Sequence, residues 1–295
     1  MKDVASAPLA IERRSGSQVA DYVQLAKPRL NLLVVATSAA GYYLGGPPAT
    51  DVALMAQAVA GTALVAGGAA VLNQLYERDT DALMWRTRLR PLPDGRVSPA
   101  DARLFGLGLT IAGLLLLAAR ANLLAAGLAF ATVFVYLIIY TPMKLLTPAS
   151  TLVGAVPGAL PALIGWTASH GSVGLGGLTL FAIVFLWQIP HFMAIAWLYR
   201  DDYRKAGFPM LSVIDGSGAR SGRHAVLFAA ALIPVSLAPI TAPVSFALVL
   251  ALGLAQLGLA ARFAITRSDA SARALFIGSI TYLPLLWTVM ILGKP

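Results

Sequence analysis

The chain has 295 residues and a formal net charge of +9; 58% of its residues are hydrophobic and only 12% are charged. This composition is far more apolar than that of an average soluble domain, so it excludes an ordinary soluble enzyme and predicts an integral membrane protein. The absence of cysteine excludes disulfides, thiolate metal sites and covalent haem attachment through a CxxCH motif.

The amino-terminal segment, residues 1–20, is polar and carries Glu12, Arg13 and Arg14. It lacks the apolar core and the small-residue cleavage site of a secretory signal peptide. We therefore expect a flexible cytoplasmic tail over residues 1–20 and a single transmembrane domain over residues 21–295. The first spanning helix of this domain is expected to act as an uncleaved insertion signal.

The rest of the chain is a succession of apolar segments, each about 17–25 residues long and therefore able to cross a bilayer as a helix. Pro47 and Pro48 separate the first two segments. The softest division lies at Pro243, because a single kinked helix also tolerates a proline. The chain is thus predicted to be all-α, with nine transmembrane helices. They cover residues 30–46, 52–75, 102–119, 122–141, 148–168, 175–199, 224–241, 243–262 and 273–292.

The basic residues fall on one side of this nine-helix arrangement. If the amino end is cytoplasmic, all 22 lysines and arginines except Arg120 and Lys294 lie in cytoplasmic segments. The positive-inside rule then places the carboxyl end outside and predicts a protein of the bacterial inner membrane. Topology also explains the net charge of +9, so the basic run from Arg86 to Arg90 does not call for a nucleic-acid partner.

Three polar residues stand four positions apart where the segment 52–75 gives way to charged sequence: Asn73, Glu77 and Asp81. At helical spacing, successive members of this series turn by only about 40°, so all three share one helical stripe. An amide and two carboxylates are oxygen ligands suited to a hard cation such as Mg2+. Asp79 lies on the other side of the helix and is expected to face water or Arg78.

A second acidic pair, Asp201 and Asp202, follows the apolar segment 175–199 at its inner end. One interpretation is a second metal-binding cluster facing the first; the other is a solvated helix end paired with Arg200 or Arg204. Two carboxylate clusters with arginines around them suit a diphosphate bridged by Mg2+. The apolar bundle would hold the lipid tail of such a substrate. The candidate diphosphate ligands are Arg78, Arg86, Arg90, Lys144, Arg204 and Lys205, of which Arg86 and Arg90 are alternatively topology determinants.

His191 lies inside a predicted span, where an ionisable side chain is by default a functional candidate. It stands eleven residues before Asp202, close to three helical turns, so we expect both on one helical face. Pro190 favours a local break that would turn the imidazole into a cavity. His191 is either a haem iron ligand or pocket base, or a histidine bonded to a neighbouring helix.

The spacing Asn73-x3-Glu77-x3-Asp81, continued by Met84, Arg86, Thr87 and Arg90, resembles the first aspartate-rich motif of the UbiA family of intramembrane prenyltransferases. In its details it is most similar to the branch of that family that farnesylates heme. Further similar motifs are Lys27-Pro28-Arg29, Tyr140-Thr141-Pro142-x-Lys144, Trp187-Gln188-x-Pro190-His191 and Asp201-Asp202-Tyr203. The resemblance covers about residues 20–290.

The resemblance implies a UbiA-like bundle around a central cavity, with Mg2+ held by Asn73, Glu77 and Asp81 and helped by Asp202 or Asp201. It implies transfer of the farnesyl group of farnesyl diphosphate to a vinyl group of heme B, with water completing the addition to give heme O. His191 would face the heme. A heme A synthase or a terminal oxidase assembly is the implied partner for the product, besides the lipid bilayer. The second motif is reduced relative to the wider family, since no acidic residue precedes Asp201 and Asp202 by four positions.

Two rival functions remain open from the sequence. A UbiA-type enzyme acting on an aromatic or quinone precursor shares the metal site, but Pro190-His191 and Arg86-Thr87 argue against it. A cation-coupled transporter would keep its charged groups near mid-membrane at broken helices, whereas these carboxylates cluster at helix ends.

Overall fold

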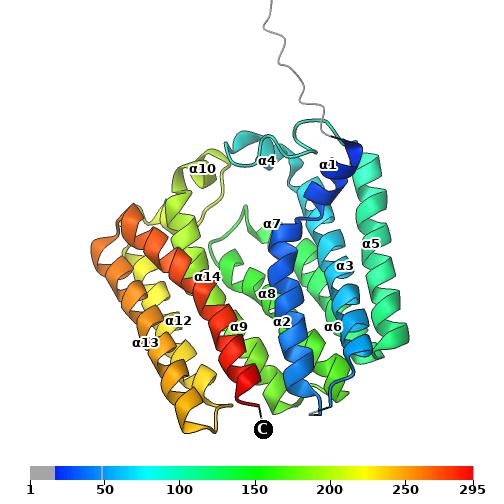
Figure 1. The fold of residues 1–295 in the computed structure, drawn as a ribbon. Helices are drawn as coiled ribbons and strands as arrows, with labels where there is room; N and C mark the ends of the chain where they lie inside the picture. The colour runs from blue at the N-terminus through cyan, green and yellow to red at the C-terminus, as the bar shows by residue number, and fades with distance from the viewer. Residues whose placement is uncertain (1–16, 48, 295) are drawn as a thin grey trace, which may run out of the picture.

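The structure is a computed structural model that describes residues 17–47 and 49–294, so most of the predicted amino-terminal tail lies outside the described residues. All regular elements of the described part are helices, which confirms the all-α prediction (Figure 1). The long helices are α2 (Pro28–Gly45), α3 (Val52–Tyr76), α5 (Pro99–Arg120), α8 (Ser150–His170), α9 (Gly174–Leu198), α12 (Ala219–Leu237), α13 (Pro243–Thr266) and α14 (Asp269–Leu292).

One further long helical segment is built from three pieces: α6 (Leu123–Phe134), the π-helical turn η1 (Val135–Tyr140) and α7 (Thr141–Met143). The short helices are α1 (Gln18–Leu25), α4 (Arg78–Leu83), α10 (Arg200–Lys205) and α11 (Leu211–Ile214). Helix α1 begins within the stretch expected to be a loose tail, because the hydroxyl of Ser17 accepts a bond from the N–H of Ala20 and caps it.

Each of the nine predicted segments coincides with one long helical segment of the described residues. Seven of these are long and apolar enough to cross a membrane. The other two, α2 and α12, carry polar residues in their first turns, among them Arg29 in α2 and Arg220 in α12. The prediction of a polytopic membrane protein is therefore confirmed, while nine crossings stay a prediction. The division at Pro243 is real, since α12 ends at Leu237 and α13 begins at Pro243.

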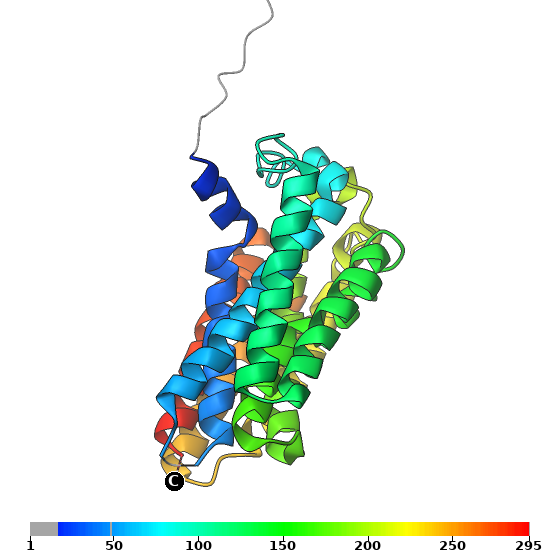
Figure 2. The same cartoon turned by 90° about the vertical axis from the view of Figure 1, so that its right-hand side faces the viewer.

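The helices form two groups that face each other. In the first group α3 packs along α5 and α2 along α8; in the second, α12 packs against α13 and α9, and α14 against α13 and α9. Figures 1 and 2 show that α1, α4 and α10 lie at one end of the bundle and the carboxyl end of the chain at the other. Arg120, the last residue of α5, and Lys294 lie at this second end, as the charge distribution predicts.

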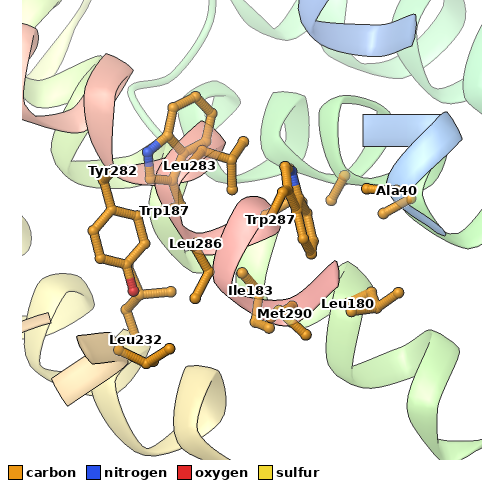
Figure 3. Close-up of a cluster of buried hydrophobic side chains, with 14 residues drawn as sticks. Ala40, Leu180, Ile183, Trp187, Leu232, Tyr282, Leu283, Leu286, Trp287 and Met290 are labelled. Atoms are coloured by element: carbon orange, nitrogen blue, oxygen red, sulfur yellow. The ribbon is translucent and has the colours of Figure 1, made fainter. Parts of the chain in front are cut away.

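The second group is held together by a core of buried apolar side chains (Figure 3). Trp187 and Ile183 of α9 pack there against Leu283 and Leu286 of α14, and Ala40 of α2 joins from the first group. All of these side chains are buried. This contact and the more extensive packing of α8 against α9 join the two groups beside the cavities described below.

Helices α2 and α8 approach each other through glycines. A Cβ on Gly165 of α8 would overlap the carbonyl oxygen of Ser38, and a Cβ on Gly41 of α2 would overlap that of Ala162. Backbone oxygens cannot move away from an added methyl as a flexible side chain can, so the two helices would have to separate. These glycines therefore set the distance between α2 and α8, both of which line the site.

We predict that Gly165→Ala lowers the free energy of unfolding by about 1–3 kcal/mol through overpacking. Gly127→Ala in α6 is the matched control, because a Cβ there meets no atom within 4 Å and alanine is the better helix former. Denaturation of the purified variants in mixed detergent micelles measures both. Equal stability of the two variants would show that α2 and α8 are not in contact at Gly165.

Candidate functional site

Two adjoining chambers open inside the bundle at the junction of the two helix groups. The first, of about 270 Å³, lies at the end that carries α4 and α10, and we call it the polar chamber. The second, of about 290 Å³, lies between α2, α3, α8 and α9, and we call it the apolar chamber. Leu30, Tyr136, Tyr140 and Phe192 line both, so the chambers meet at these four side chains. The polar and charged lining residues of the polar chamber are Lys27, Asn73, Glu77, Asp81, Arg86, Arg90, Tyr136, Tyr140, Lys144, Ser150, Thr151 and Tyr203.

The three residues of the predicted metal stripe, Asn73, Glu77 and Asp81, all line the polar chamber and are buried. The spacing predicted that all three lie on one helix, but the structure places them across the junction of two helices. Helix α3 ends at Tyr76 and α4 begins at Arg78, with Glu77 at the junction. The N–H of Glu77 donates to the carbonyl of Asn73 at 2.9 Å, and that of Asp81 to the carbonyl of Glu77 at 2.8 Å. Helical hydrogen bonding thus continues across the junction and keeps the three side chains on one side.

Each buried carboxylate of the stripe is paired with a cation. Lys144 Nζ lies 2.8 Å from Glu77 Oε1, and Arg90 Nη1 lies 2.6 Å from Asp81 Oδ2. Burial alone would lower the pKa of Lys144, but the neighbouring Tyr140 and Glu77 hold it above its ordinary value. The polar chamber therefore presents carboxylates and cations side by side, a charge pattern that suits a metal–anion pair.

The amide of Asn73 is held in one orientation. Its Nδ2 donates to Thr141 Oγ1 at 3.0 Å, while the Thr141 hydroxyl donates to the carbonyl of Tyr136 at 2.7 Å. The Tyr136 hydroxyl in turn donates to Asn73 Oδ1 at 3.1 Å. Because a carbonyl oxygen has two lone pairs, Oδ1 keeps acceptor capacity for a further ligand.

Lys27 lines the polar chamber, although the sequence named it only in a motif and assigned it no site role. It precedes Pro28 at the start of α2 and holds the left-handed backbone conformation, with φ of 50°, that non-glycine residues adopt rarely. Burial lowers the pKa of Lys27 to about 7, and the charges of Arg90 and Lys144 act in the same direction. An anion bound beside Lys27 would raise its pKa again and so favour the charged form of the side chain. The Lys27-Pro28-Arg29 motif was the available signal for this role.

Ser150 and Thr151 were also missed. Both are buried in the first turn of α8 and line the polar chamber. The hydroxyl oxygen of Thr151 has no hydrogen-bond partner among the residues that the structure describes. A buried hydroxyl without a partner is costly, so this oxygen is free to bind a substrate or a metal-bound group. No sequence pattern distinguishes these two residues from ordinary helix-start residues.

Several predicted site residues lie elsewhere. Arg78 is paired with Asp79 at 2.9 Å and Arg204 with Asp201 at 2.7 Å, on the exposed surface. The structure brings none of the following residues to the lining of the polar chamber: Arg78, Asp201, Asp202, Arg204 and Lys205. Arg86 does line it, and its guanidinium lies over the ring of Tyr199 at 5.0 Å.

The second acidic pair lies outside the lining of the polar chamber. Helix α9 ends at Leu198, Tyr199 has φ −111° and ψ 22°, and α10 starts at Arg200. Helical hydrogen bonding continues across this junction, since the N–H of Tyr199 donates to the carbonyl of Ile195 at 3.0 Å and that of Tyr203 to the carbonyl of Tyr199 at 3.1 Å. His191 lines the apolar chamber, whereas Asp202 lines neither chamber, contrary to expectation. In α10 it is Tyr203 that turns toward the chamber. Accordingly, within residues 17–47 and 49–294, no three acidic, histidine or cysteine side chains converge as a metal cluster.

His191 lines the apolar chamber, as expected for a residue facing a cavity. The predicted break at Pro190 is absent, since α9 runs unbroken from Gly174 to Leu198. The imidazole stacks on Trp187, with ring centroids 5.3 Å apart, and on Phe276 at 5.0 Å. Its Nδ1 lies 2.8 Å from the hydroxyl oxygen of Ser279 in α14. The contact with Ser279 agrees with the interpretation of a histidine bonded to a neighbouring helix, while a role as heme ligand or pocket base stays a prediction.

The sequence pattern of the UbiA prenyltransferase family matches residues 34–287. This chain belongs to the UbiA prenyltransferase family. Solved structures agree on the fold of the family: a UbiA homolog from Archaeoglobus fulgidus bound to GPP and Mg2+ superposes with a TM-score of 0.66 at 18% identity, covering 92% of this chain and 99% of that one.

Within the UbiA family, two relatives have much higher sequence identity. A protoheme IX farnesyltransferase from Solibacter usitatus is 43% identical, covering 93% of this chain and 99% of its own length. A protoheme IX farnesyltransferase from Opitutus terrae is also 43% identical, covering 95% of this chain and 96% of its own length. This chain therefore matches these farnesyltransferases along nearly their full lengths.

The polar chamber of this UbiA family member fits a hard divalent cation. The candidate ligands are oxygens only: the Asn73 amide, the Glu77 and Asp81 carboxylates, and the unpartnered hydroxyl of Thr151. Mg2+ prefers oxygen ligands and binds through one or two carboxylates together with substrate phosphates. Lys27, Arg86, Arg90 and Lys144 lie in the same chamber to receive the phosphates.

Proposed function

We propose that this prenyltransferase transfers the farnesyl group of farnesyl diphosphate to a vinyl group of heme B, with addition of water, giving heme O and diphosphate. The observation that carries the proposal is the junction of a cationic, carboxylate-bearing chamber with an apolar one that contains a histidine. Such a pair accommodates a charged head and an apolar reaction partner. Relatives 40–43% identical along almost the whole chain, named protoheme IX farnesyltransferase, support the choice of acceptor.

The polar chamber would bind the diphosphate. Asn73, Glu77 and Asp81 would hold Mg2+, which neutralises the diphosphate oxygens and so favours departure of that group. Arg86 and Arg90 can each offer two parallel N–H donors, while Lys27 and Lys144 act as point charges. The ion pairs of Glu77 with Lys144 and Asp81 with Arg90 would rearrange so that carboxylates face the cation and basic groups face the phosphates. Asp202 as a further ligand stays a prediction, and its position outside the chamber lining does not support it.

The junction between the chambers would hold the reacting carbon of the farnesyl chain. Tyr136 and Tyr140 stack there with centroids 5.4 Å apart, and Phe192 also lines the junction. Aromatic faces attract cations, so they stabilise an allylic cation as the C–O bond to diphosphate breaks. The π-helical turn η1 places both tyrosines, consistent with the frequent occurrence of such turns at functional sites.

On the acceptor side, a vinyl carbon of heme B bonds to the allylic carbon, and the cation left on the adjacent carbon takes the oxygen of water. The water then loses a proton, which leaves a hydroxyl on the product. His191 faces this chamber and is our candidate for contact with heme B. No strong nucleophile is needed from the protein, which is consistent with a chain that has no cysteine.

We place the polar chamber at the cytoplasmic face of the bacterial inner membrane. The support is the distribution of arginines and lysines, which concentrate at the end of the bundle that carries α4 and α10. Farnesyl diphosphate would then enter from the cytoplasm and the bilayer. The product would pass to a heme A synthase or to the assembly of a terminal oxidase.

Purified protein given heme B and farnesyl diphosphate is expected to form a farnesyl-hydroxyethyl heme only while Mg2+ is present. Chelation should abolish product formation, and added Mg2+ should restore it, because the buried carboxylates would otherwise repel the diphosphate. Chromatography of the extracted hemes measures the product. If no such product forms while 4-hydroxybenzoate is prenylated, the acceptor assignment is wrong; turnover unaffected by chelation contradicts the metal assignment.

A further inference from the structure

Ser279 of α14 contacts two ring residues of α9 that line the apolar chamber, His191 and Trp187. Its hydroxyl lies 2.8 Å from Nδ1 of His191, and its backbone carbonyl accepts a bond from Nε1 of Trp187 at 2.7 Å. Ser279 is fully buried, so water does not compete for these bonds. Figure 3 shows Trp187 lying against α14 in the same core.

The direction of the bond between Ser279 and His191 follows from proton counting. The Ser279 hydroxyl also lies 2.7 Å from the carbonyl oxygen of Phe276, which can only accept. A serine hydroxyl carries a single proton, and that proton is used on Phe276. When that proton is donated to Phe276, His191 Nδ1 is the donor to Ser279, and the imidazole proton resides on Nδ1.

A neutral imidazole protonated on Nδ1 carries its lone pair on Nε2. The ring cannot easily rotate to exchange these nitrogens, because it is stacked between Trp187 and Phe276 with interplanar angles of 21° and 27°. Among the described residues, Nε2 has no hydrogen-bond partner, and His191 lines the apolar chamber. The lone pair is thus kept available in a chamber whose lining surface is mainly apolar.

We propose that Ser279 is a positioning residue that fixes His191 as the Nδ1–H tautomer and so presents Nε2 as the ligand for the iron of the heme substrate. A metal-bound histidine typically donates its other ring N–H to an oxygen acceptor, which orients the ring and raises the basicity of the ligating nitrogen. The identity of the ligand rests on the proposed function. The tautomer does not, since it depends only on contacts within the protein.

The tautomer can be tested without substrate. In protein labelled with 15N at histidine, His191 is expected to show a protonated, pyrrole-type Nδ1 and a pyridine-type Nε2, with the signals assigned by their loss in His191→Gln. The chain has only three histidines, so the spectrum is simple. Ser279→Ala removes the acceptor and should abolish the single Nδ1–H form. A wild-type signal from protonated Nε2, or an unchanged spectrum in Ser279→Ala, overturns the proposal.

The consequence for heme is tested by titration of the same proteins with heme B, followed by the Soret band. Ser279→Ala should weaken binding about tenfold and alter the band, by analogy with loss of a partner that orients a metal ligand. Ser279→Thr keeps the hydroxyl and should bind within about twofold of the wild type. The matched control is Ser236→Ala, which removes another fully buried serine, 3.0 Å from the hydroxyl of Tyr282.

Equal weakening in Ser279→Ala and Ser236→Ala would mean that Ser279 acts only on the fold, and would overturn the positioning role. A different outcome marks failure of the proposed function itself. If wild-type protein with the Nδ1–H form binds no heme B, then the heme assignment is wrong while the assignment of the tautomer to Ser279 stands.

Discussion

Asp81→Asn is expected to lower the rate of farnesyl transfer by about 100- to 1,000-fold, the range found when one preorganised electrostatic contact to a transition state is removed. Asparagine has the shape of aspartate but not its charge, so it would hold the metal and the diphosphate less well. The substitution should affect the chemistry more than heme binding, because Asp81 lines the polar chamber and not the apolar one.

The structure indicates that Asp81→Asn would keep the local fold. The hydroxyl of Thr87 donates to the backbone carbonyl of Asp81 at 2.7 Å, a bond that the substitution does not touch. Arg90 would lose its ionic partner. Its side chain is 22% exposed, so water can solvate the guanidinium. Loss of activity should therefore reflect the missing charge.

Asp79→Asn is the matched control, since Asp79 lies on the same short helix, is 86% exposed and pairs with Arg78 on the surface. Product formation at saturating heme B, farnesyl diphosphate and Mg2+ measures both variants. Asp79→Asn should be within about twofold of the wild type, since surface ion pairs contribute little. Equal losses in the two variants would contradict the assignment of Asp81 to the site.

The sequence predicts the helices of this fold well, for a physical reason. Apolar runs bounded by prolines and charges leave few alternatives in a bilayer, where every backbone group must be bonded within its own segment. The predicted segment 175–199 corresponds to helix α9 (Gly174–Leu198), and 52–75 to helix α3 (Val52–Tyr76). Short connecting helices are less predictable, because their start and phase depend on tertiary contacts.

In the candidate site, too, residues placed by local helical spacing could be predicted, whereas residues placed by tertiary packing could not. Glu77 and Asp81 could be predicted because i, i+4 bonding persists through the junction of α3 and α4. Asp202 could not be placed, because the spacing does not show which side of α10 faces the chamber: Tyr203 lines the polar chamber and Asp202 does not. Ser279 is 88 residues from His191 in sequence, and their contact depends on how α14 is rotated against α9. No local pattern encodes that rotation.

His191→Ala should produce the opposite effect to Asp81→Asn. It is expected to weaken heme B binding by about 100-fold, the upper end of the loss seen when even an orienting partner of a metal ligand is removed. Binding of farnesyl diphosphate with Mg2+ should change little, because the polar chamber does not include His191. The stability of the bundle should fall only modestly, since Trp187 and Phe276 remain to fill the space with their own contacts.

His224→Ala is the control for His191→Ala. His224 also bonds one acceptor, the carbonyl of Arg220 at 2.9 Å, and also stacks on a phenylalanine, Phe228, at 6.4 Å. It lies in the first turns of α12 and lines neither chamber. Heme titration followed by the Soret band measures heme binding, equilibrium binding of farnesyl diphosphate with Mg2+ measures the second binding event, and diphosphate release measures turnover. If His191→Ala binds heme as tightly as His224→Ala but turns over slowly, then His191 acts as a base for the attacking water and not as the iron ligand.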